Sequence, residues 1–132
     1  MMKSIVRILM PGHRISADGI GLPTGGAEIT AVQLVKNEEG GFRTGDFYRV
    51  SGVIRPVDPQ GYDIQFQAGF PVEWNGRILQ YGGGGLDGTV APIEWVSLGQ
   101  SLFGPRQLSK GYISVYCDSG HQADPENYWN AG

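Results

Sequence analysis

Glycine is the residue that most constrains what this chain can fold into. It occupies 22 of the 132 positions, and eight prolines accompany it. An average protein contains only about 7% glycine, so turns and loops should take a large share of the chain. We therefore expect no long helix.

The composition predicts one folded unit. Apolar residues make up 40% of the chain and charged residues 17%, so enough apolar surface exists to offset the entropy lost on folding. A chain of this length usually forms a single core. The net charge of −3 and the scattered Lys and Arg residues argue against nucleic acid as a partner.

Five segments have the residue pattern of β-strands. The clearest alternates apolar and polar positions, with Ile64, Phe66 and Ala68 on one face. Gln65 and Gln67 fall on the other face, as the two-residue period of a strand requires. The segments that we predict to be strands cover residues 27–35, 47–54, 63–70, 77–81 and 111–117.

Helical signals are weak. Between residues 93 and 110 an apolar stripe formed by Trp95, Leu98, Leu102 and Leu108 is interrupted by Gly104 and Pro105, which limits it to a short helix. The predicted fold class is α/β, a partial α/β-hydrolase-like fold made mostly of strands and glycine-rich loops with at most one or two short helices.

We expect residues 1–132 to form one partial domain. Residues 1–19 are expected to be poorly ordered, and residues 123–132 have the appearance of a truncated end. The apolar stretch at the start is broken by Arg7 and is too short for the core of a signal peptide. No stretch is long and apolar enough to predict a membrane span.

The strongest local signal is a run of four glycines, Gly82 to Gly85, directly after the predicted strand 77–81. Glycine lacks a Cβ, so its backbone N–H groups can approach an anion closely. The alternative interpretation is a flexible turn. The run matches neither of the common phosphate-binding glycine motifs.

Several motifs in a fixed order resemble the tannase and feruloyl esterase family. A Trp74-Asn75-Gly76 turn leads through a strand into the glycine run, and a later strand ends in Asp118-Ser119-Gly120-His121. The segments 20–26 and 53–59 also resemble the amino-terminal portion of that family. The resemblance extends from about residue 20 to about residue 122.

Membership of that family would imply an α/β-hydrolase-type serine esterase that cleaves feruloyl or galloyl esters through a Ser-His-Asp triad. The resemblance assigns the glycine run to the oxyanion hole. Its backbone donors would be Gly82, Gly83, Gly84 and Gly85, with Gly83 and Gly84 the best placed. No cofactor and no metal ligand are implied.

No catalytic triad residue can be assigned in this chain. None of its eight serines lies in a G-x-S-x-G frame, and the family's nucleophile belongs to a motif further downstream. Asp118, Ser119 and His121 match a family loop that lies beside the site. We therefore expect them to order the loop or to lie close to the substrate, and not to be members of the triad.

Cys117 is the only cysteine, so the chain cannot close an internal disulfide. On an apolar strand with no neighbouring base, it is expected to be a packing residue. Family members are typically secreted or periplasmic, but no clear signal peptide marks this sequence, so its compartment stays open.

Two functions are compatible with the sequence. The first is an amino-terminal fragment of an esterase that is inactive alone. It would bind a phenolic ester only when the missing catalytic part is present, and its exposed strand edges would favour self-association. The alternative is a small non-catalytic β-rich module that binds phenolic or carbohydrate ligands.

Overall fold

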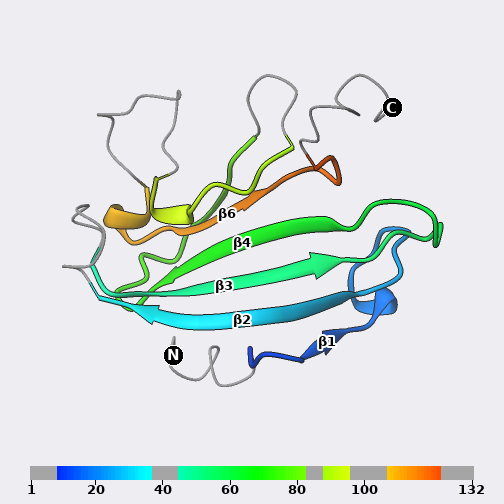
Figure 1. The fold of residues 1–132 in the computed structure, drawn as a ribbon. Coiled ribbons are helices and arrows are strands. Elements are labelled where there is room, and N and C mark those ends of the chain that lie inside the picture. The colour runs from blue at the N-terminus through cyan, green and yellow to red at the C-terminus, as the bar shows by residue number, and fades with distance from the viewer. Residues whose placement is uncertain (1–8, 37–44, 83–87, 96–106, 123–132) are drawn as a thin grey trace.

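A computed structural model describes residues 9–36, 45–82, 88–95 and 107–122. They form a six-stranded mixed sheet with the order β1-β2-β3-β4-β6-β5 (Figure 1). The strands are β1 (Arg14–Ile15), β2 (Ala27–Val35), β3 (Phe47–Ile54), β4 (Ile64–Pro71), β5 (Ile78–Gln80) and β6 (Ile113–Cys117).

The predicted strands are all present among the described residues. Segments 27–35 and 47–54 have the predicted bounds, whereas 63–70 is shifted by one residue and the last two strands are shorter. β2, β3 and β4 pair antiparallel with their neighbours in the chain. The prediction of a mostly β structure is confirmed.

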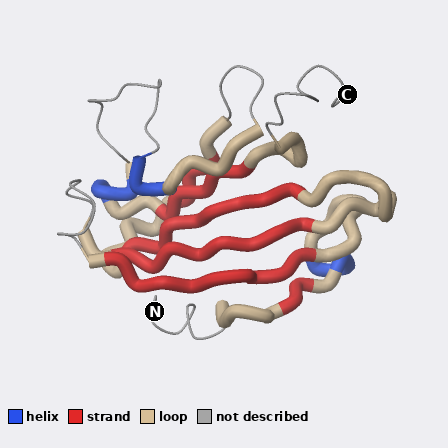
Figure 2. Tube along the Cα trace, viewed as in Figure 1, coloured by secondary structure: helices blue, strands red, loops and turns tan. Residues whose placement is uncertain are grey.

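Helical structure is limited to short 3₁₀ helices in the described parts of the chain (Figure 2). Their bounds are Ala17–Gly19 for η1, Ile93–Trp95 for η2 and Leu108–Lys110 for η4. Leu98 and Leu102 of the predicted stripe lie outside the described residues. Of the stretch expected to be poorly ordered, residues 9–19 are described and contain β1 and η1.

β2 contains a β-bulge that changes which side chains face each side of the sheet. Ile29 is opposite Gly52 and Ala31 is opposite Ser51, so Thr30 is an extra residue. An extra residue reverses the alternation of the strand beyond it. Ile29 and Val35 are consequently both buried, on opposite faces.

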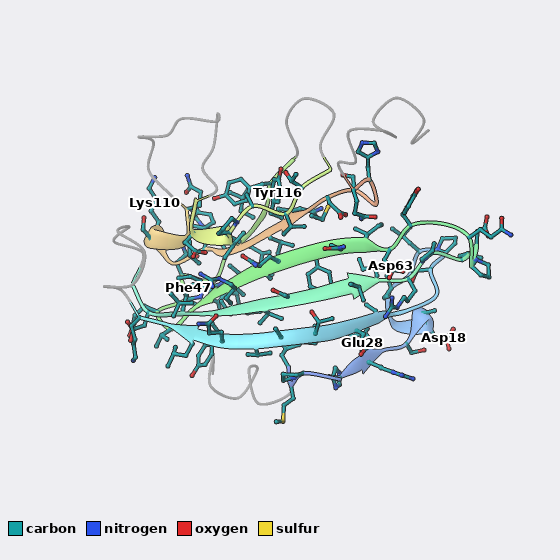
Figure 3. All side chains as sticks on the ribbon, viewed as in Figure 1. Asp18, Glu28, Phe47, Asp63, Lys110 and Tyr116 are labelled. Carbon is teal, nitrogen blue, oxygen red and sulfur yellow. The ribbon has the colours of Figure 1, made fainter. Side chains whose placement is uncertain are left out.

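One side of the sheet, the covered face, carries the hydrophobic cluster of the molecule. Phe47 and Val35 pack there against Ile93 of η2 and Leu108 of η4. Figure 3 shows Phe47 and Lys110 at the same end of the sheet. A Cβ added to Gly69 would lie 2.9 Å from Leu108 Cδ1, so glycine here allows η4 to approach the sheet.

The other side, the apolar face, is defined by two rows of side chains that cross the strands. Val32, Val50, Ala68 and Val115 are opposite one another in β2, β3, β4 and β6. In the next row the Phe66 ring lies over Gly52, beside Cys117. Since side chains alternate along strands, the polar Gln67 belongs to the covered face.

The β5–β6 pair is the parallel part of the sheet. Ile78, Leu79 and Gln80 are opposite Ile113, Ser114 and Val115, while the other edge of β6 pairs antiparallel with β4. β6 thus has one partner of each kind. The compact apolar run at residues 111–117 is typical of a buried parallel strand, and its pairing is parallel at the β5 edge only.

Candidate functional site

The candidate site lies where two neighbouring parallel strands end. β5 ends at Gln80 and leads to Gly82, and β6 ends at Cys117 and leads to Asp118. In open sheets with parallel strands, ligands bind beyond the carboxyl ends of the strands. The glycine run and the loop at residues 118–121 therefore begin at the same edge of the sheet.

The glycine run starts from a fixed residue. Tyr81 is buried, and its backbone N–H donates to the Val115 carbonyl oxygen at 2.8 Å, which extends the β5–β6 pairing by one residue. Gly82 is exposed, with open space where a Cβ would lie. Gly83, Gly84 and Gly85, three of the four predicted oxyanion donors, lie outside the described residues.

The turn before β5 holds that strand in register. The indole Nε1–H of Trp74 donates to the Arg77 carbonyl oxygen, and the Arg77 N–H donates to Asn75 Oδ1, both at 2.9 Å. Gly76 completes the turn with φ of 85°, a conformation that side chains disfavour. The Trp-Asn-Gly sequence thus forms a self-contained turn.

Asn75 also joins this turn to the segment before β6. Its side-chain Nδ2–H donates to the Lys110 carbonyl oxygen at 2.8 Å, and its backbone N–H donates to the Gly111 carbonyl oxygen at 2.9 Å. Gly111 has φ of 83°, and a Cβ there would lie 2.6 Å from the Glu73 carbonyl oxygen. The starts of both parallel strands are therefore connected.

Arg77 and Tyr112 add a side-chain contact between the same two segments. Arg77 Nη1 donates to the Tyr112 hydroxyl oxygen at 3.1 Å, and the guanidinium carbon lies 5.9 Å from the centroid of the Tyr112 ring. This hydrogen bond raises the pKa of Arg77 above its ordinary value. Arg77 therefore keeps its charge at any physiological pH.

Downstream of the glycine run, η2 is anchored to the covered face. The Ile93 N–H donates to Gln67 Oε1 at 2.7 Å, and the Ile93 side chain is fully buried. The next residue, Glu94, is buried and forms an ion pair with Arg49 of β3. Both ends of the segment that contains the glycine run are thereby fixed to the sheet.

Asp118 is a buried residue that joins the end of β6 to the start of β4. Its Oδ1 accepts hydrogen bonds from the backbone N–H groups of Gln65 and Gly120, each at 2.9 Å. Its Oδ2 accepts a hydrogen bond from Gln122 Nε2 at 2.6 Å. Hydrogen bonds of this kind offset the burial of a polar group. Gln122 Nε2 also donates to the Asp63 carbonyl oxygen at 3.0 Å.

The turn after Asp118 presents Ser119 and His121. The His121 N–H donates to the Asp118 carbonyl oxygen at 3.1 Å, and Ser119 and Gly120 have φ values of 59° and 76°. Two successive positive φ values define a type I′ turn. Ser119 is exposed and His121 is half-buried, so the turn holds the two side chains in different environments.

Sequence reasoning selected the ends of β5 and β6 but missed the residues that hold them. Gln67, Arg49 and Glu94 carry no motif of their own, and each acts through a partner distant in the sequence, whereas Asn75 belongs to the Trp74-Asn75-Gly76 turn that the sequence already indicated. Only the Asn75-Gly76 dipeptide is a recognisable turn signal. Among the described residues, no group of three His, Cys, Asp or Glu is placed to hold a metal ion.

A separate recess of about 600 Å³ lies between β1 and the start of β2. Arg14, Glu28 and Arg55 supply its charged groups. None of its lining residues belongs to the candidate site. Glu28 and Asp63, both partners of Arg55, are at the end of the sheet opposite Phe47 (Figure 3).

Comparison with known proteins identifies the family. A family model described as tannase and feruloyl esterase matches residues 48–132, more than half of the chain. An uncharacterized esterase of Agrobacterium fabrum is 42% identical over 110 residues, which are 83% of this chain and 20% of that protein. The chain belongs to the tannase and feruloyl esterase family.

A second relative is the mono(2-hydroxyethyl) terephthalate hydrolase of Piscinibacter sakaiensis. It is 33% identical over 75 residues, which are 54% of this chain and 12% of that protein. The chain therefore spans about a fifth of the length of the first relative and a smaller share of the second. None of the described helices is long and apolar enough to cross a membrane.

Proposed function

We propose that this chain is the amino-terminal portion of a carboxylic ester hydrolase, in which the glycine run stabilises the oxyanion and the nucleophile comes from polypeptide outside this sequence. Ester cleavage places negative charge on the carbonyl oxygen, which backbone N–H groups stabilise. Gly82 to Gly85 would be those donors. Alone, the chain would be inactive.

The observation that carries the proposal is the anchoring of the segment that contains the glycine run, at Tyr81 before the run and at η2 after it. Upstream, Tyr81 continues the hydrogen bonding to β6. Downstream, Gln67 and Arg49 hold η2 against the covered face. Oxyanion donors are effective only when their positions are fixed before the charge develops, and Tyr81 and η2 are fixed points before and after the segment that contains the run.

The free edge of β5 supports an origin of the nucleophile outside this sequence. Among the described residues β5 pairs only with β6, and Ile78 on β5 is 67% exposed. Parallel strands are usually buried inside a sheet. A further parallel strand at this edge would end beside the glycine run. A nucleophilic serine carried there would meet a carbonyl held by the glycine amides.

Aromatic carboxylic esters are the proposed substrate class. The name of the family includes feruloyl esters, and that of the second relative specifies a terephthalate ester. Both acyl groups carry an aromatic ring beside the scissile ester or conjugated with it. We extend this class to the present chain through its kinship, with a feruloyl or galloyl ester as the substrate.

A chimera tests the proposal. In it, this chain replaces the matched fifth of the Agrobacterium esterase, and hydrolysis of methyl ferulate and methyl gallate is measured. We expect turnover by the chimera and none by the isolated chain. Treatment with a fluorophosphonate should label a serine contributed by the relative and leave every serine of this chain unmodified.

Two results would reject the proposal. Turnover by the isolated chain would show that it contains its own nucleophile. Tight binding of methyl ferulate by the isolated chain, together with an inactive but folded chimera, would favour the non-catalytic binding module. A Gln67→Leu chimera serves as a test of the anchor and should lose kcat with little change in KM.

A further inference from the structure

An exposed aromatic side chain lies beside the candidate site, on the loop between β3 and β4. Tyr62 is 61% exposed. Its loop, residues 55–63, projects from the end of the sheet at which β6 also ends (Figure 1). Binding residues are found disproportionately on loops that a rigid scaffold holds in place. The loop of Tyr62 therefore lies at the same end of the sheet as the start of the glycine run and the turn after Asp118.

This loop packs directly against the turn that follows β6. A Cβ added to Gly120 would lie 3.2 Å from Ile64 Cγ1 and 3.8 Å from the Tyr62 carbonyl oxygen. Gln122 Nε2 donates a hydrogen bond to the Asp63 carbonyl oxygen at 3.0 Å. The backbone at Tyr62 and Asp63 is thus held alongside the turn, although the two segments are far apart in the sequence.

Contacts within the loop fix its shape. The guanidinium of Arg55 at its start forms an ion pair with the Asp63 carboxylate at its end. Between them, the Gly61 N–H donates to the Asp58 carbonyl oxygen at 2.9 Å, and the Gln60 N–H donates to Asp58 Oδ1 at 2.9 Å. A preorganised loop loses little conformational entropy when a ligand binds. These contacts meet that requirement.

The separation between Tyr62 and the glycine run limits which substrates can contact both. β4 and β5 lie on opposite sides of β6, so two strand spacings, about 10 Å, separate their backbones. Gly82 follows the end of β5, whereas Tyr62 precedes the start of β4. The two residues are therefore at least about 10 Å apart, a gap that the tyrosine side chain and the substrate have to bridge together.

We propose that Tyr62 is a specificity-determining residue that packs against the ring of a feruloyl group and favours feruloyl over galloyl esters. A feruloyl group carries its ring at the end of a vinylene linker, whereas a galloyl ring is attached directly to the ester carbonyl carbon. Only the longer group extends from the glycine run to Tyr62. The inference rests on the proposed function, because it places the ester carbonyl at that run. Two aromatic rings in offset or edge-to-face contact attract each other beyond the area that they bury.

The chimera with the Agrobacterium esterase measures this role. Tyr62→Ala should raise KM for methyl ferulate about three- to tenfold. It should leave kcat within about twofold of the parent value, because the ring contact is present in the ground state and the transition state alike. KM for methyl gallate should change less than about twofold, since its ring does not reach Tyr62. Tyr62→Phe keeps the ring and should restore the parent KM for methyl ferulate.

Val57 provides a matched control on the same loop. It is 66% exposed, and Val57→Ala should leave KM for both esters unchanged. Each variant should melt at the temperature of the parent chimera, because exposed side chains contribute little to stability. The proposal would be overturned if Tyr62→Ala left KM for methyl ferulate unchanged, or if it raised KM equally for both esters.

A binding measurement separates this inference from the proposed function. Ferulate, which has no ester to cleave, is titrated into the chimera and its Kd is measured by calorimetry. If the chimera is inactive but Tyr62→Ala weakens ferulate binding at least threefold, ester hydrolysis is rejected and the role of Tyr62 stands. An active chimera that Tyr62→Ala leaves unaltered would reject only the role of Tyr62. An inactive chimera that binds no ferulate would reject both.

Discussion

The guanidinium of Arg49 on β3 forms an ion pair with Glu94 in η2, 45 residues further along the chain. Glu94 is 7% exposed, and Arg49 Nη1 also donates to Gln33 Oε1 at 3.3 Å. The pair binds the segment after the glycine run to the centre of the sheet. Its effect on stability depends on both charges being present.

Removal of one charge should destabilise the chain more than removal of both. Glu94→Ala leaves Arg49 without its carboxylate and should lower the free energy of unfolding by about 2–4 kcal/mol. The Arg49→Met/Glu94→Leu variant should be closer to wild type, because apolar replacement of a buried pair is often neutral. Urea unfolding of each variant measures the difference.

The exposed pair of Lys36 and Asp46 is the control for that experiment. Its side chains are 59% and 37% exposed, so Asp46→Asn should change the free energy of unfolding by only about 0–1 kcal/mol. If Glu94→Ala and Asp46→Asn lower the free energy of unfolding equally, burial of the Arg49–Glu94 pair makes no difference to its effect on stability.

Asp118 should be required for stability. Asp118→Ala removes the acceptor of three hydrogen bonds and leaves the Gln65 N–H without a partner in a half-buried site. We expect a loss of about 2–4 kcal/mol in the free energy of unfolding. Asp58→Ala, which removes one hydrogen bond to the exposed Gln60 N–H, should cost about 1 kcal/mol or less. Thermal and urea unfolding would reveal whether the two differ.

Gly69 should not tolerate a side chain. Gly69→Ala places a Cβ 2.9 Å from Leu108 Cδ1 and 3.2 Å from Ile93 Cγ2, and such overpacking costs about 1–3 kcal/mol. Gly19→Ala, with open space around its Cβ, should change stability by less than about 0.5 kcal/mol. Comparable melting temperatures for the two variants would show that η4 can shift away from the Cβ added at Gly69 without a loss of stability.

Asn75 should control the pairing of β5. Asn75→Ala removes its hydrogen bonds to the Lys110 carbonyl oxygen and the Arg77 N–H, at a cost of about 1–2 kcal/mol. The Tyr81 amide depends on the same register, so its hydrogen-exchange rate should then rise. The exchange rate of the Val50 amide in the sheet centre should change only as far as the global stability changes. Hydrogen exchange followed by NMR separates the two effects.

Much of the fold could be predicted because the strands of this chain carry local signals. The alternation of Ile64, Phe66 and Ala68 with glutamines defines β4, and the turn residues around β2 and β3 define their ends. The bulge at Thr30 could not be predicted, because Ala31 and Val32 fit either phase of the alternation. The position of β6 between β4 and β5 depends on contacts distant in sequence, which no local pattern encodes.

The candidate site was predictable in part for the same reason. The run from Gly82 and the residues from Asp118 to His121 stand out as motifs, and both begin at the same edge of the sheet. The role of Asp118 became evident only from its contacts with Gln65 and Gln122. Gly83, Gly84 and Gly85 lie outside the described residues, so their role as oxyanion donors stays a prediction.

The order of the strands has a consequence for how the protein assembles during synthesis. β2, β3 and β4 are successive antiparallel neighbours, so they can form a meander as soon as they leave the ribosome. β5 is made before β6, its partner in the described sheet, and must wait more than thirty residues for it. The strand that leads into the glycine run is therefore completed late, after the hairpins that support it.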